Sequence, residues 1–481
     1  MTSSKDCHGA TMTSSKDYNG AKLRLHVVMF PWLAFGHMFP HLELSRLIAQ
    51  KGHTVSFIST PHNIDRLLPR LPENLSSAIN FVKIPLPSDN KLPDDCEATT
   101  DVPLHLVPYL KIAMDGMQTP VTEFLESSKP DWILQDFVPH WLPSVSRRLG
   151  CKTGFLSAFS SATLATLIAP GFDEEYRTSP ADFLTPPKWI PFETTVAYKL
   201  YECRNLFKGF MATTFEGNIP DVDRMAGVIN GCDVIVVRSC YEYEAKWLEL
   251  IQKLHGKPVI PVGVLPPNLE EKYADSDTWL SLKAWLDSRQ TKSVVHVSFG
   301  SEAMPSQTQL NEIALGLELS GLPFFWVLKT QRGPWDTEPV ELPEGFEERT
   351  KERGMVWRGW VELLRTLSHD SIGLVLTHSG WGTPIEAIRF AKPMVVLAFM
   401  NDQGLNARVI EEKKIGYMIP RDETEGFFTK ESVAKSLRLV MEDEEGKVYR
   451  ENVKDMRGVF GDMDRQDRYV DSFLDYLVAN R

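Results

Sequence analysis

Apolar residues along this chain fall in short runs that alternate with longer segments in which they recur at helical spacing. Short apolar runs bounded by turn residues are typical of buried strands, and the longer segments are typical of amphipathic helices. In the first half, this pattern predicts strands at 23–30, 53–59, 79–84, 131–137, 152–157 and 232–237, and helices at 38–51, 104–127 and 141–149. Such alternation predicts a parallel α/β sheet.

A second series of strands and helices begins near residue 256. Residues 261–276 contain prolines and then acidic residues, the composition of a linker. The pattern predicts strands at 293–299, 324–328, 371–376 and 394–398, and helices at 307–320, 384–391, 429–441 and 449–477. We expect Thr383 to cap the helix that Pro384 opens. Because 481 residues are too many for one ordinary core, we expect two domains.

Two segments depart from this alternation. Residues 1–21 contain a near repeat, MTSSKDCHGA and then MTSSKDYNGA, which is small and polar, so we expect a disordered tail. Residues 170–220 are irregular and rich in proline and aromatic residues. This second stretch is a candidate lining for a substrate pocket, and an ordinary surface excursion explains it equally well.

Composition narrows the classes of function. The net charge of −12 argues against a nucleic-acid polymer as partner. The six cysteines are scattered without CxxC spacing, which argues against a disulfide framework or a zinc site and fits a reducing compartment. The polar N-terminus lacks the apolar core of a secretion signal, and no apolar run approaches the roughly 18 residues of a membrane span. We therefore expect a cytoplasmic protein.

Candidate chemistry is densest between residues 360 and 403. A strand, a small-residue turn at 377–382 and a helix start form a site for an anion, because unpaired N–H groups and the helix dipole favour negative charge. His378 stands at this turn and can donate to a phosphate oxygen. Glu386 lies one helical turn further, where its carboxylate can accept from both hydroxyls of a ribose.

The ends of the same segment supply the remaining parts of a sugar-nucleotide site. Trp360 can stack on a flat base. Asp402 and Gln403 follow a strand, at the edge where open α/β sheets bind ligands. The turn taken alone has an ordinary structural explanation about as often as a functional one. The complete arrangement is more specific and indicates a sugar nucleotide.

A candidate catalytic pair lies in the first half. The loop WLAFGH places His37 after the first strand, and Asp136 ends the fourth strand at the same carboxyl edge. A histidine, with an unperturbed pKa of about 6.5, suits the removal of a proton from a hydroxyl, and a carboxylate on its other nitrogen fixes the tautomer. A lone histidine in such a loop is more often structural. Together with Asp136 and the nucleotide features, His37 is a catalytic candidate.

Other chemistries for this loop are weaker. His37 and His41 are four residues apart, as metal ligands on a helix can be, but Pro40 lies between them and no HExxH pattern is present. No Asp-x-Asp follows a strand, so we expect no metal. The loop has a single glycine rather than GxGxxG, which argues against a dinucleotide oxidoreductase.

Residues 360–403 resemble the signature box of plant family 1 UDP-glycosyltransferases. The family pattern (W, then H, G, THCGWNS, E, P and D/E-Q) is met at Trp360, His369, Gly373, Thr377, His378, Gly380, Trp381, Glu386, Pro393, Asp402 and Gln403. The resemblance extends from about residue 23 to the C-terminus. The stretches HVVMFPWLAFGHMFPHLELSRLIAQKGHTVSFIST and ELPEGFEERTKERGMVW resemble the branch that adds a sugar to terpenoid and flavonoid glycosides.

This resemblance implies a GT-B fold, with two Rossmann-like domains facing across a cleft. It implies an acceptor-binding domain at 22–255, a UDP-sugar-binding domain at 256–462 and a last helix, 463–481, that returns to the first domain. His37 and Asp136 match the catalytic histidine and its orienting aspartate. The implied donor-binding residues are Ser301, Trp360, Val361, His378, Gly380, Trp381, Gly382, Thr383, Glu386, Asp402 and Gln403. The candidate acceptor-binding residues are Phe35, His140 and Trp141.

The chain also departs from the family pattern. Where the box usually continues Trp-Ala-Pro-Gln, this chain has Leu363 in the place of the glutamine that contacts the ribose. Ser379 replaces the usual cysteine, and Gly382 and Thr383 replace the usual Asn-Ser. Gly382 has no side-chain amide to reach the diphosphate, so two donor contacts are changed.

The expected activity is inverting, metal-independent transfer of a sugar from UDP to a hydroxyl of a small molecule, without a further cofactor. The acceptor expected is a sugar hydroxyl of a terpenoid or flavonoid glycoside. The terminal Gln403 resembles users of UDP-glucose, and UDP-rhamnose remains the alternative. Two functions of other classes remain as alternatives. One is a nucleotide-sugar binding protein without turnover, and the other is a UDP-sugar epimerase. We expect a monomer.

Overall fold

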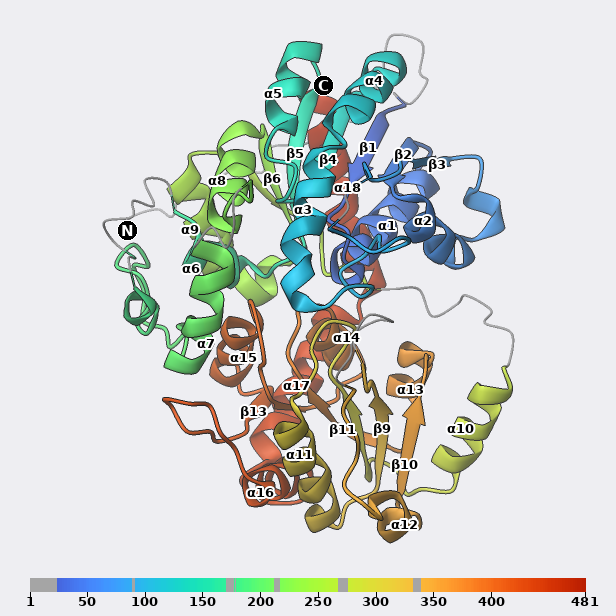
Figure 1. The fold of residues 1–481 in the computed structure, drawn as a ribbon, viewed down its shortest axis with the longest axis vertical. Coiled ribbons are helices and arrows are strands. Elements are labelled where there is room, and N and C mark those ends of the chain that lie inside the picture. Colours follow the sequence, from blue (N-terminus) through green and yellow to red (C-terminus); the bar gives the residue numbers. More distant parts are fainter. Residues whose placement is uncertain are drawn as a thin grey trace, which may run out of the picture.

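The computed structural model describes seven stretches of the chain, namely residues 24–88, 91–169, 177, 179–211, 217–266, 276–331 and 339–481. Within them the chain forms two parallel sheets, each with its own helices, which lie one above the other in Figure 1. This is the predicted pair of Rossmann-like domains. The N-terminal repeat and most of the predicted linker lie outside the described residues.

The first sheet has seven strands in the order β3-β2-β1-β4-β5-β6-β7. Its strands are β1 (His26–Phe30), β2 (Thr54–Ser59), β3 (Ile79–Lys83), β4 (Trp132–Gln135), β5 (Lys152–Ser157), β6 (Val234–Val237) and β7 (Val259–Pro261). All neighbouring strands are parallel. The edge strand β7 lies past residue 255, where the sequence pattern placed the end of the first domain.

The second sheet has six strands in the order β10-β9-β8-β11-β12-β13, again all parallel. Its strands are β8 (Val294–Ser298), β9 (Phe324–Leu328), β10 (Gly354–Arg358), β11 (Ile372–Thr377), β12 (Met394–Val396) and β13 (Gly416–Met418). The outer strands β10 and β13 were not predicted, because they are only partly buried and do not form the continuous apolar runs that mark the central strands.

Helices connect the strands of both sheets. Those of the first domain are α1 (Phe35–Gln50), α2 (Pro61–Leu67), α3 (Val107–Asp115), α4 (Gln118–Ser128), α5 (Leu142–Leu149), α6 (Ser161–Leu167), α7 (Leu200–Leu206), α8 (Asp221–Gly231) and α9 (Tyr241–His255). Those that follow are α10 (Asp277–Asp287), α11 (Gln307–Ser320), α12 (Phe346–Thr350), α13 (Leu363–Ser368), α14 (Gly382–Arg389), α15 (Gln403–Glu412), α16 (Lys430–Met441), α17 (Lys447–Phe460) and α18 (Met463–Ala479).

Burial on both faces explains why the strands read as continuous apolar runs. Along β1, Val28 and Phe30 enter one hydrophobic cluster while Val27 and Met29 enter another on the opposite face. Successive side chains of a strand point to opposite faces, so a strand between two helical layers needs apolar residues at every position. The same holds for β8, whose residues are all buried.

Two predicted long helices are broken. The segment 104–127 forms a short 3₁₀ turn (Leu104–Leu106), then α3 and α4. The break lies at Gly116, because Pro120 has no N–H to donate to the carbonyl of Gly116. A side chain at Gly116 would also be 2.7 Å from Pro87 Cγ. The segment 449–477 forms α17 and α18, and the second of these begins after Asp462, whose side chain accepts from the Arg465 N–H.

The last helix, α18, leaves the second domain and packs on the first sheet (Figure 1, red). Its residues Val470, Phe473 and Leu477 are buried in one cluster with Trp132 of β4. The Trp132 indole N–H donates to the Leu477 carbonyl at 3.0 Å. The end of the chain is therefore a structural part of the first domain.

Buried polar contacts join the two domains beside α15. Ser160, which caps α6, donates to the Asn406 side-chain oxygen at 2.7 Å. Arg408 of α15 donates to Glu202 of α7 at 2.9 Å, and both side chains are almost fully buried. A buried ion pair that loses one partner leaves an uncompensated charge, so these contacts fix the relative position of the domains.

We expect Phe473→Ala to destabilise the protein by about 3–5 kcal/mol, because it empties a fully buried position of α18. The exposed neighbour Asp475 provides the control, and Asp475→Ala should change stability by less than about 0.5 kcal/mol. Denaturant unfolding and hydrogen exchange of α1 and α18 measure the effect. Equal unfolding midpoints for the two variants would contradict the packing role of α18.

Candidate active site

The first candidate site lies where the strand order of the first sheet reverses direction. β1 and β4 are neighbours, and the chain proceeds from them toward opposite edges, which opens a crevice at their carboxyl ends. His37 is in the first turn of α1, which follows β1, and Asp136 directly follows β4. The two side chains meet, with His37 Nδ1 2.8 Å from Asp136 Oδ2.

Asp136 is held rigidly in this crevice. Its Oδ2 also accepts from the Trp32 N–H at 3.1 Å, and its Oδ1 accepts from the Phe137 N–H at 2.8 Å. Burial alone would raise the pKa of Asp136, but the charge and hydrogen bond of His37 and the bond from Phe137 outweigh it and lower that pKa. Asp136 is therefore ionised and accepts the proton that His37 carries on Nδ1.

The other ring nitrogen of His37 is then the basic one. Burial would lower the pKa of His37, but Asp136, with smaller contributions from Asp402 and Glu302, raises that pKa above its usual value. The ring packs against two aromatic rings, with centroids 5.8 Å from Phe137 and 5.3 Å from Phe159, and these two rings also contact each other at 5.8 Å. These contacts orient Nε2 as a proton acceptor.

The second candidate site occupies the corresponding position of the second sheet, between β8 and β11. Gly300 follows β8 and His378 follows β11. A Cβ atom at Gly300 would lie 2.7 Å from His378 Cε1, and one at Gly380 would lie 2.5 Å from Nε2, so both positions require glycine. Burial lowers the pKa of His378 to about 4, so its imidazole is neutral at neutral pH.

The helix that follows this turn begins earlier than predicted. α14 starts at Gly382 with Trp381 as the cap residue and no side-chain cap, so the expectation that Thr383 caps the helix was wrong. The backbone turns sharply enough at Ser379, with φ of +63°, to start the helix without a polar cap. Thr383 is a buried residue inside the first turn. No side chain accepts from the first N–H groups of α14, although the Thr383 N–H donates to the Gly380 carbonyl at 3.1 Å and Pro384 has no N–H.

Trp381 has its side chain in the domain interface. Its indole N–H donates to the Arg238 carbonyl at 2.8 Å, and its ring packs on Tyr243 with centroids 5.4 Å apart. Arg238 and Tyr243 belong to the first domain. Only the backbone of Trp381 is therefore placed to meet a ligand at the start of α14.

Glu386 has no hydrogen-bond partner among the described residues. Burial raises the pKa of Glu386 to about 7, against the opposing effect of Arg238, Arg70 and Arg389. Two of these cations, Arg238 and Arg70, come from the first domain. A half-buried carboxyl group without a protein partner is free to bind hydroxyl groups of a ligand.

Trp360 is 61% exposed, the value expected of a stacking platform rather than of a core tryptophan. The Arg70 guanidinium lies 5.8 Å from its ring centroid and 4.2 Å from that of Phe39. Trp360 thus faces a cation of the opposite domain. Sequence reasoning missed Arg70, since nothing in its short 3₁₀ turn distinguishes it from a surface arginine.

The two residues that close the box are ordered by contacts within their own loop. Asp402 accepts from the Asn406 side chain at 2.7 Å. Gln403 Oε1 accepts from the N–H groups of Phe399 and Met400 at 2.9 and 3.1 Å, which leaves the amide nitrogen as the end that can reach a ligand. Burial raises the pKa of Asp402.

The remaining donor candidates lie at the edges of this site. Val361 is buried in a cluster with Trp279, so its side chain belongs to the core. Leu363 is the first residue of α13 and is half-buried against the core. Ser301 is exposed after Gly300, and its carbonyl accepts from Lys329 at 2.6 Å.

The three candidate acceptor-binding residues differ in how far their side chains are exposed. Phe35 is partly exposed at the start of α1 and packs on Phe39, and His140 is half-buried near Asp115. Trp141 is 7% exposed and packs on Phe30 in the core. Its position offers no argument for contact with an acceptor.

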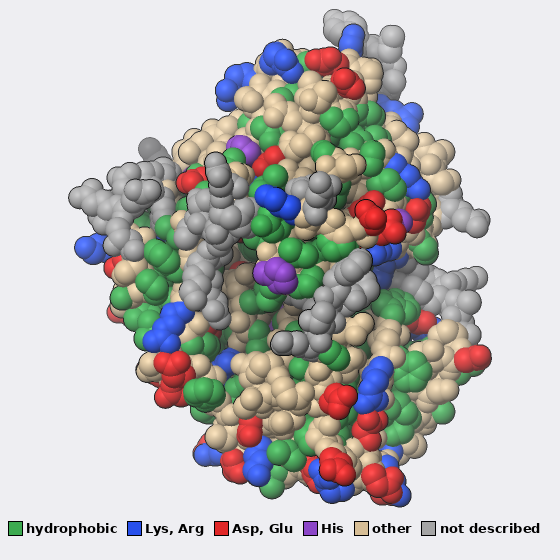
Figure 2. Space-filling model, viewed as in Figure 1, with side chains coloured by type: hydrophobic (Ala, Val, Ile, Leu, Met, Phe, Trp, Pro, Cys, Tyr) green, Lys and Arg blue, Asp and Glu red, His purple; other side chains and the backbone are tan. Residues whose placement is uncertain are grey.

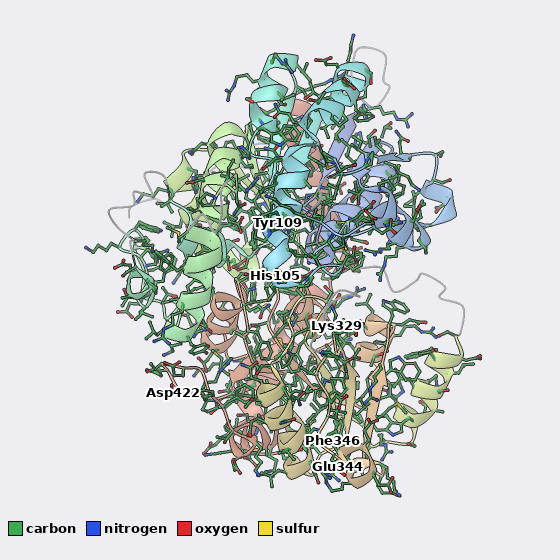
Figure 3. All side chains as sticks on the ribbon, viewed as in Figure 1. His105, Tyr109, Lys329, Glu344, Phe346 and Asp422 are labelled. Carbon is green, nitrogen blue, oxygen red and sulfur yellow. The ribbon has the colours of Figure 1, made fainter. Side chains whose placement is uncertain are left out.

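The two sites face one another across the domain boundary. Thr99 of the first domain donates to Glu302 of the second at 2.6 Å, and the charges of Asp402 and Glu302 act on His37. Figure 2 shows a hollow between the two halves on this face. In Figure 3, His105 of the first domain and Lys329 of the second lie beside this boundary. The proton acceptor therefore adjoins the glycine-lined turn.

Several negative observations apply to the described residues. They contain no group of three or more His, Cys, Asp or Glu side chains arranged to hold a metal ion. None of the helices within them has both the length and the apolar composition needed to cross a membrane. The five cysteines among them are free. Independence from a metal or cofactor stays a prediction.

Comparison with known proteins covers nearly the whole chain. The model of the family described as "UDP-glucoronosyl and UDP-glucosyl transferase" matches residues 203–470, and that described as "Glycosyltransferase, N-terminal domain" matches residues 24–131. UDP-glycosyltransferase 91A1 of Arabidopsis thaliana is 79% identical over 98% of this chain and 100% of its own length. Soyasaponin III rhamnosyltransferase of Glycine max is 40% identical over 95% of this chain and 96% of its own length.

A solved structure gives the same fold. That of Glycyrrhiza uralensis UGT73P12 complexed with glycyrrhetinic acid 3-O-monoglucuronide matches with a TM-score of 0.75 at 23% identity, over 95% of this chain and 96% of the other. At this identity the likeness bears on the fold alone. The sequence matches carry the assignment of activity: the chain belongs to the plant family 1 UDP-glycosyltransferases and is a UDP-glycosyltransferase with the two-domain GT-B fold.

Proposed function

We propose that this enzyme transfers a sugar from UDP, with inversion and without a metal ion, to a sugar hydroxyl of a terpenoid or flavonoid glycoside. The observation that carries the proposal is the His37–Asp136 pair, which lies within electrostatic reach of Asp402 and Glu302 of the donor domain. A proton acceptor beside a sugar-nucleotide site is the arrangement that transfer to a hydroxyl requires.

In the proposed reaction, His37 Nε2 takes the proton of the acceptor hydroxyl as its oxygen attacks the anomeric carbon. The bond between that carbon and the UDP oxygen breaks, and its electron pair leaves with UDP from the opposite face. Asp136 stabilises the imidazolium that forms. The positive end of α14, which no side chain caps, and neutral His378 stabilise the charge on the departing diphosphate.

The donor residues divide between base, ribose and sugar in this proposal. Trp360 stacks on the uracil, and Glu386 accepts from the ribose hydroxyls. The amide nitrogen of Gln403 donates to the sugar. Glucose is the favoured sugar because this glutamine resembles that of UDP-glucose users. Rhamnose is the second candidate, because a relative that is 40% identical is named a rhamnosyltransferase.

The test offers UDP-glucose and UDP-rhamnose separately to a panel of terpenoid and flavonoid glycosides and their aglycones. We expect mass spectrometry to show one added sugar on the glycosides, with UDP-glucose as the better donor. If the glycosides gain a sugar only when UDP-rhamnose is offered, the donor is UDP-rhamnose and not UDP-glucose. Conjugation of aglycones only would reject the acceptor class. Altered free sugar would indicate an epimerase, and binding without product a non-catalytic protein.

We expect His37→Ala to lower turnover by about 10²–10⁴-fold without weakening UDP binding, because it removes the proton acceptor alone. Rapid-quench assays at saturating donor and calorimetry with UDP measure the two effects. His62, whose side chain is 43% exposed, provides the matched control, and the turnover of His62→Ala should equal that of the wild type. A folded His37→Ala enzyme with normal turnover would reject the role.

We expect Asp136→Asn to lower turnover and also to shift its pH dependence. Because Asp136 raises the pKa of His37, the acidic limb of the wild-type profile should lie above about pH 6.5, since only neutral His37 accepts a proton. Asparagine lacks the negative charge that raises the pKa of His37, while burial still lowers that pKa. The acidic limb of the pH profile should therefore move to lower pH. The pH profile of kcat checks this, and an unshifted limb would mean that His37 is not the titrating base.

We expect Glu386→Ala to weaken UDP binding by about 1.5–3 kcal/mol, the value of a hydrogen bond to a charged group, with a smaller effect on turnover at saturating donor. Ribose is remote from the reacting carbon, so it is held equally throughout the reaction. Calorimetry with UDP measures the loss, and the exposed Glu411→Ala serves as control. Wild-type affinity of the Glu386 variant would place the ribose elsewhere.

A further inference from the structure

Arg238 is a buried cation at the boundary between the two domains. It directly follows β6, at the carboxyl edge of the first sheet, and is 5% exposed. Its carbonyl accepts from the Trp381 indole N–H at 2.8 Å. This bond places Arg238 beside the residue that precedes α14, although the two residues belong to different domains.

The guanidinium of Arg238 is fixed in orientation. Its Nε donates to the Val264 carbonyl at 2.9 Å, and its Nη2 donates to the Leu265 carbonyl at 3.4 Å. The third nitrogen, Nη1, has no hydrogen-bond partner among the described residues. Because the guanidinium is planar, binding two of its nitrogens determines where the third one points.

Nη1 points at the start of α14. A Cβ atom built at Gly382 would have Nη1 as its neighbour at 3.9 Å, with no other described atom within 4 Å outside the two adjacent residues and the helix's own backbone. Gly382 stands where the family pattern has an asparagine whose amide reaches the diphosphate. The space left by that side chain is thus bordered by a cation from the opposite domain.

The charge on Arg238 lacks a close protein counter-ion. No carboxylate of the described residues lies within ion-pair distance of it, and Glu386 and Glu43 act on it from further away. Burial lowers the pKa of Arg238 to about 10, so the group stays charged at neutral pH. A buried cation is costly unless it is paired, and an anion at the start of α14 would supply the partner.

We infer that Arg238 contacts the diphosphate of the UDP-sugar through Nη1 and replaces the asparagine amide that Gly382 lacks. The donor site is then built by both domains, and its occupation adds a charged contact between them. This inference rests on the proposed location of the diphosphate at α14. An arginine–phosphate contact is stronger than the neutral amide contact that it replaces.

The test measures affinities for UDP and for uridine, which has no phosphate, by calorimetry. We expect Arg238→Met to weaken UDP binding by about 10- to 100-fold and to leave uridine binding unchanged. Arg238→Lys should lose less UDP affinity than Arg238→Met, because it keeps the charge. If the Met variant does not fold, Arg238→Gln and Arg238→Lys give the same comparison. Equal losses for UDP and uridine would show a structural role only and overturn the inference.

A compensating substitution sharpens the test. Gly382→Asn has room for its Cβ atom. In the Arg238→Gln background it should raise UDP affinity at least about threefold, a gain within the usual net value of a neutral hydrogen bond. In the wild-type background the same asparagine should add little, because Nη1 already borders that space. A gain of equal size in both backgrounds would mean that the two side chains do not share a ligand atom, which would overturn the inference.

Glu386→Ala separates this inference from the proposed donor site. If Glu386→Ala weakens UDP binding while Arg238→Met does not, the donor lies at α14 and only the Arg238 contact is wrong. If neither variant changes UDP affinity, the proposed location of the donor fails and the Arg238 contact fails with it. Circular dichroism and unfolding midpoints confirm that each variant is folded.

Discussion

All strands of a parallel sheet end at the same edge, and in this protein the carboxyl edges of two such sheets meet. Arg238 follows β6 and Trp381 follows β11, and the hydrogen bond between them joins one edge to the other. Each edge carries the crevice that forms where strand order reverses. The position of a proton acceptor opposite a nucleotide site follows from this one constraint.

The groups at this boundary are held by partners that set their charge as well as their place. Asp136 is buried but ionised, because His37 and backbone N–H groups stabilise its negative charge. His378 is buried without such a partner charge and stays neutral. The two histidines at this boundary thus have opposite pKa shifts, and the cause is the presence of a carboxylate beside only one of them.

The differences from the predicted elements have local causes. Continuous apolar runs identified the central strands, because burial on both faces demands them, whereas β10 and β13 are only partly buried and do not have such runs. The apolar pattern predicted one helix over residues 104–127. This range contains Pro120, which lacks the N–H that a continuous helix needs. Thr383 was expected to cap α14, but the left-handed turn at Ser379 starts that helix earlier.

The sequence by itself determined the alternation of strands and helices, the two-domain α/β class and the residue types of the site. These depend on local periodicity and on spacing within one strand-turn-helix unit. It also indicated that His37 and Asp136 share an edge, since parallel strands impose this. Tertiary structure alone decided that the Trp381 side chain lies in the interface and that Arg238 reaches Gly382. Those contacts join residues more than a hundred positions apart in different domains, and only the packing of one sheet against the other brings them together.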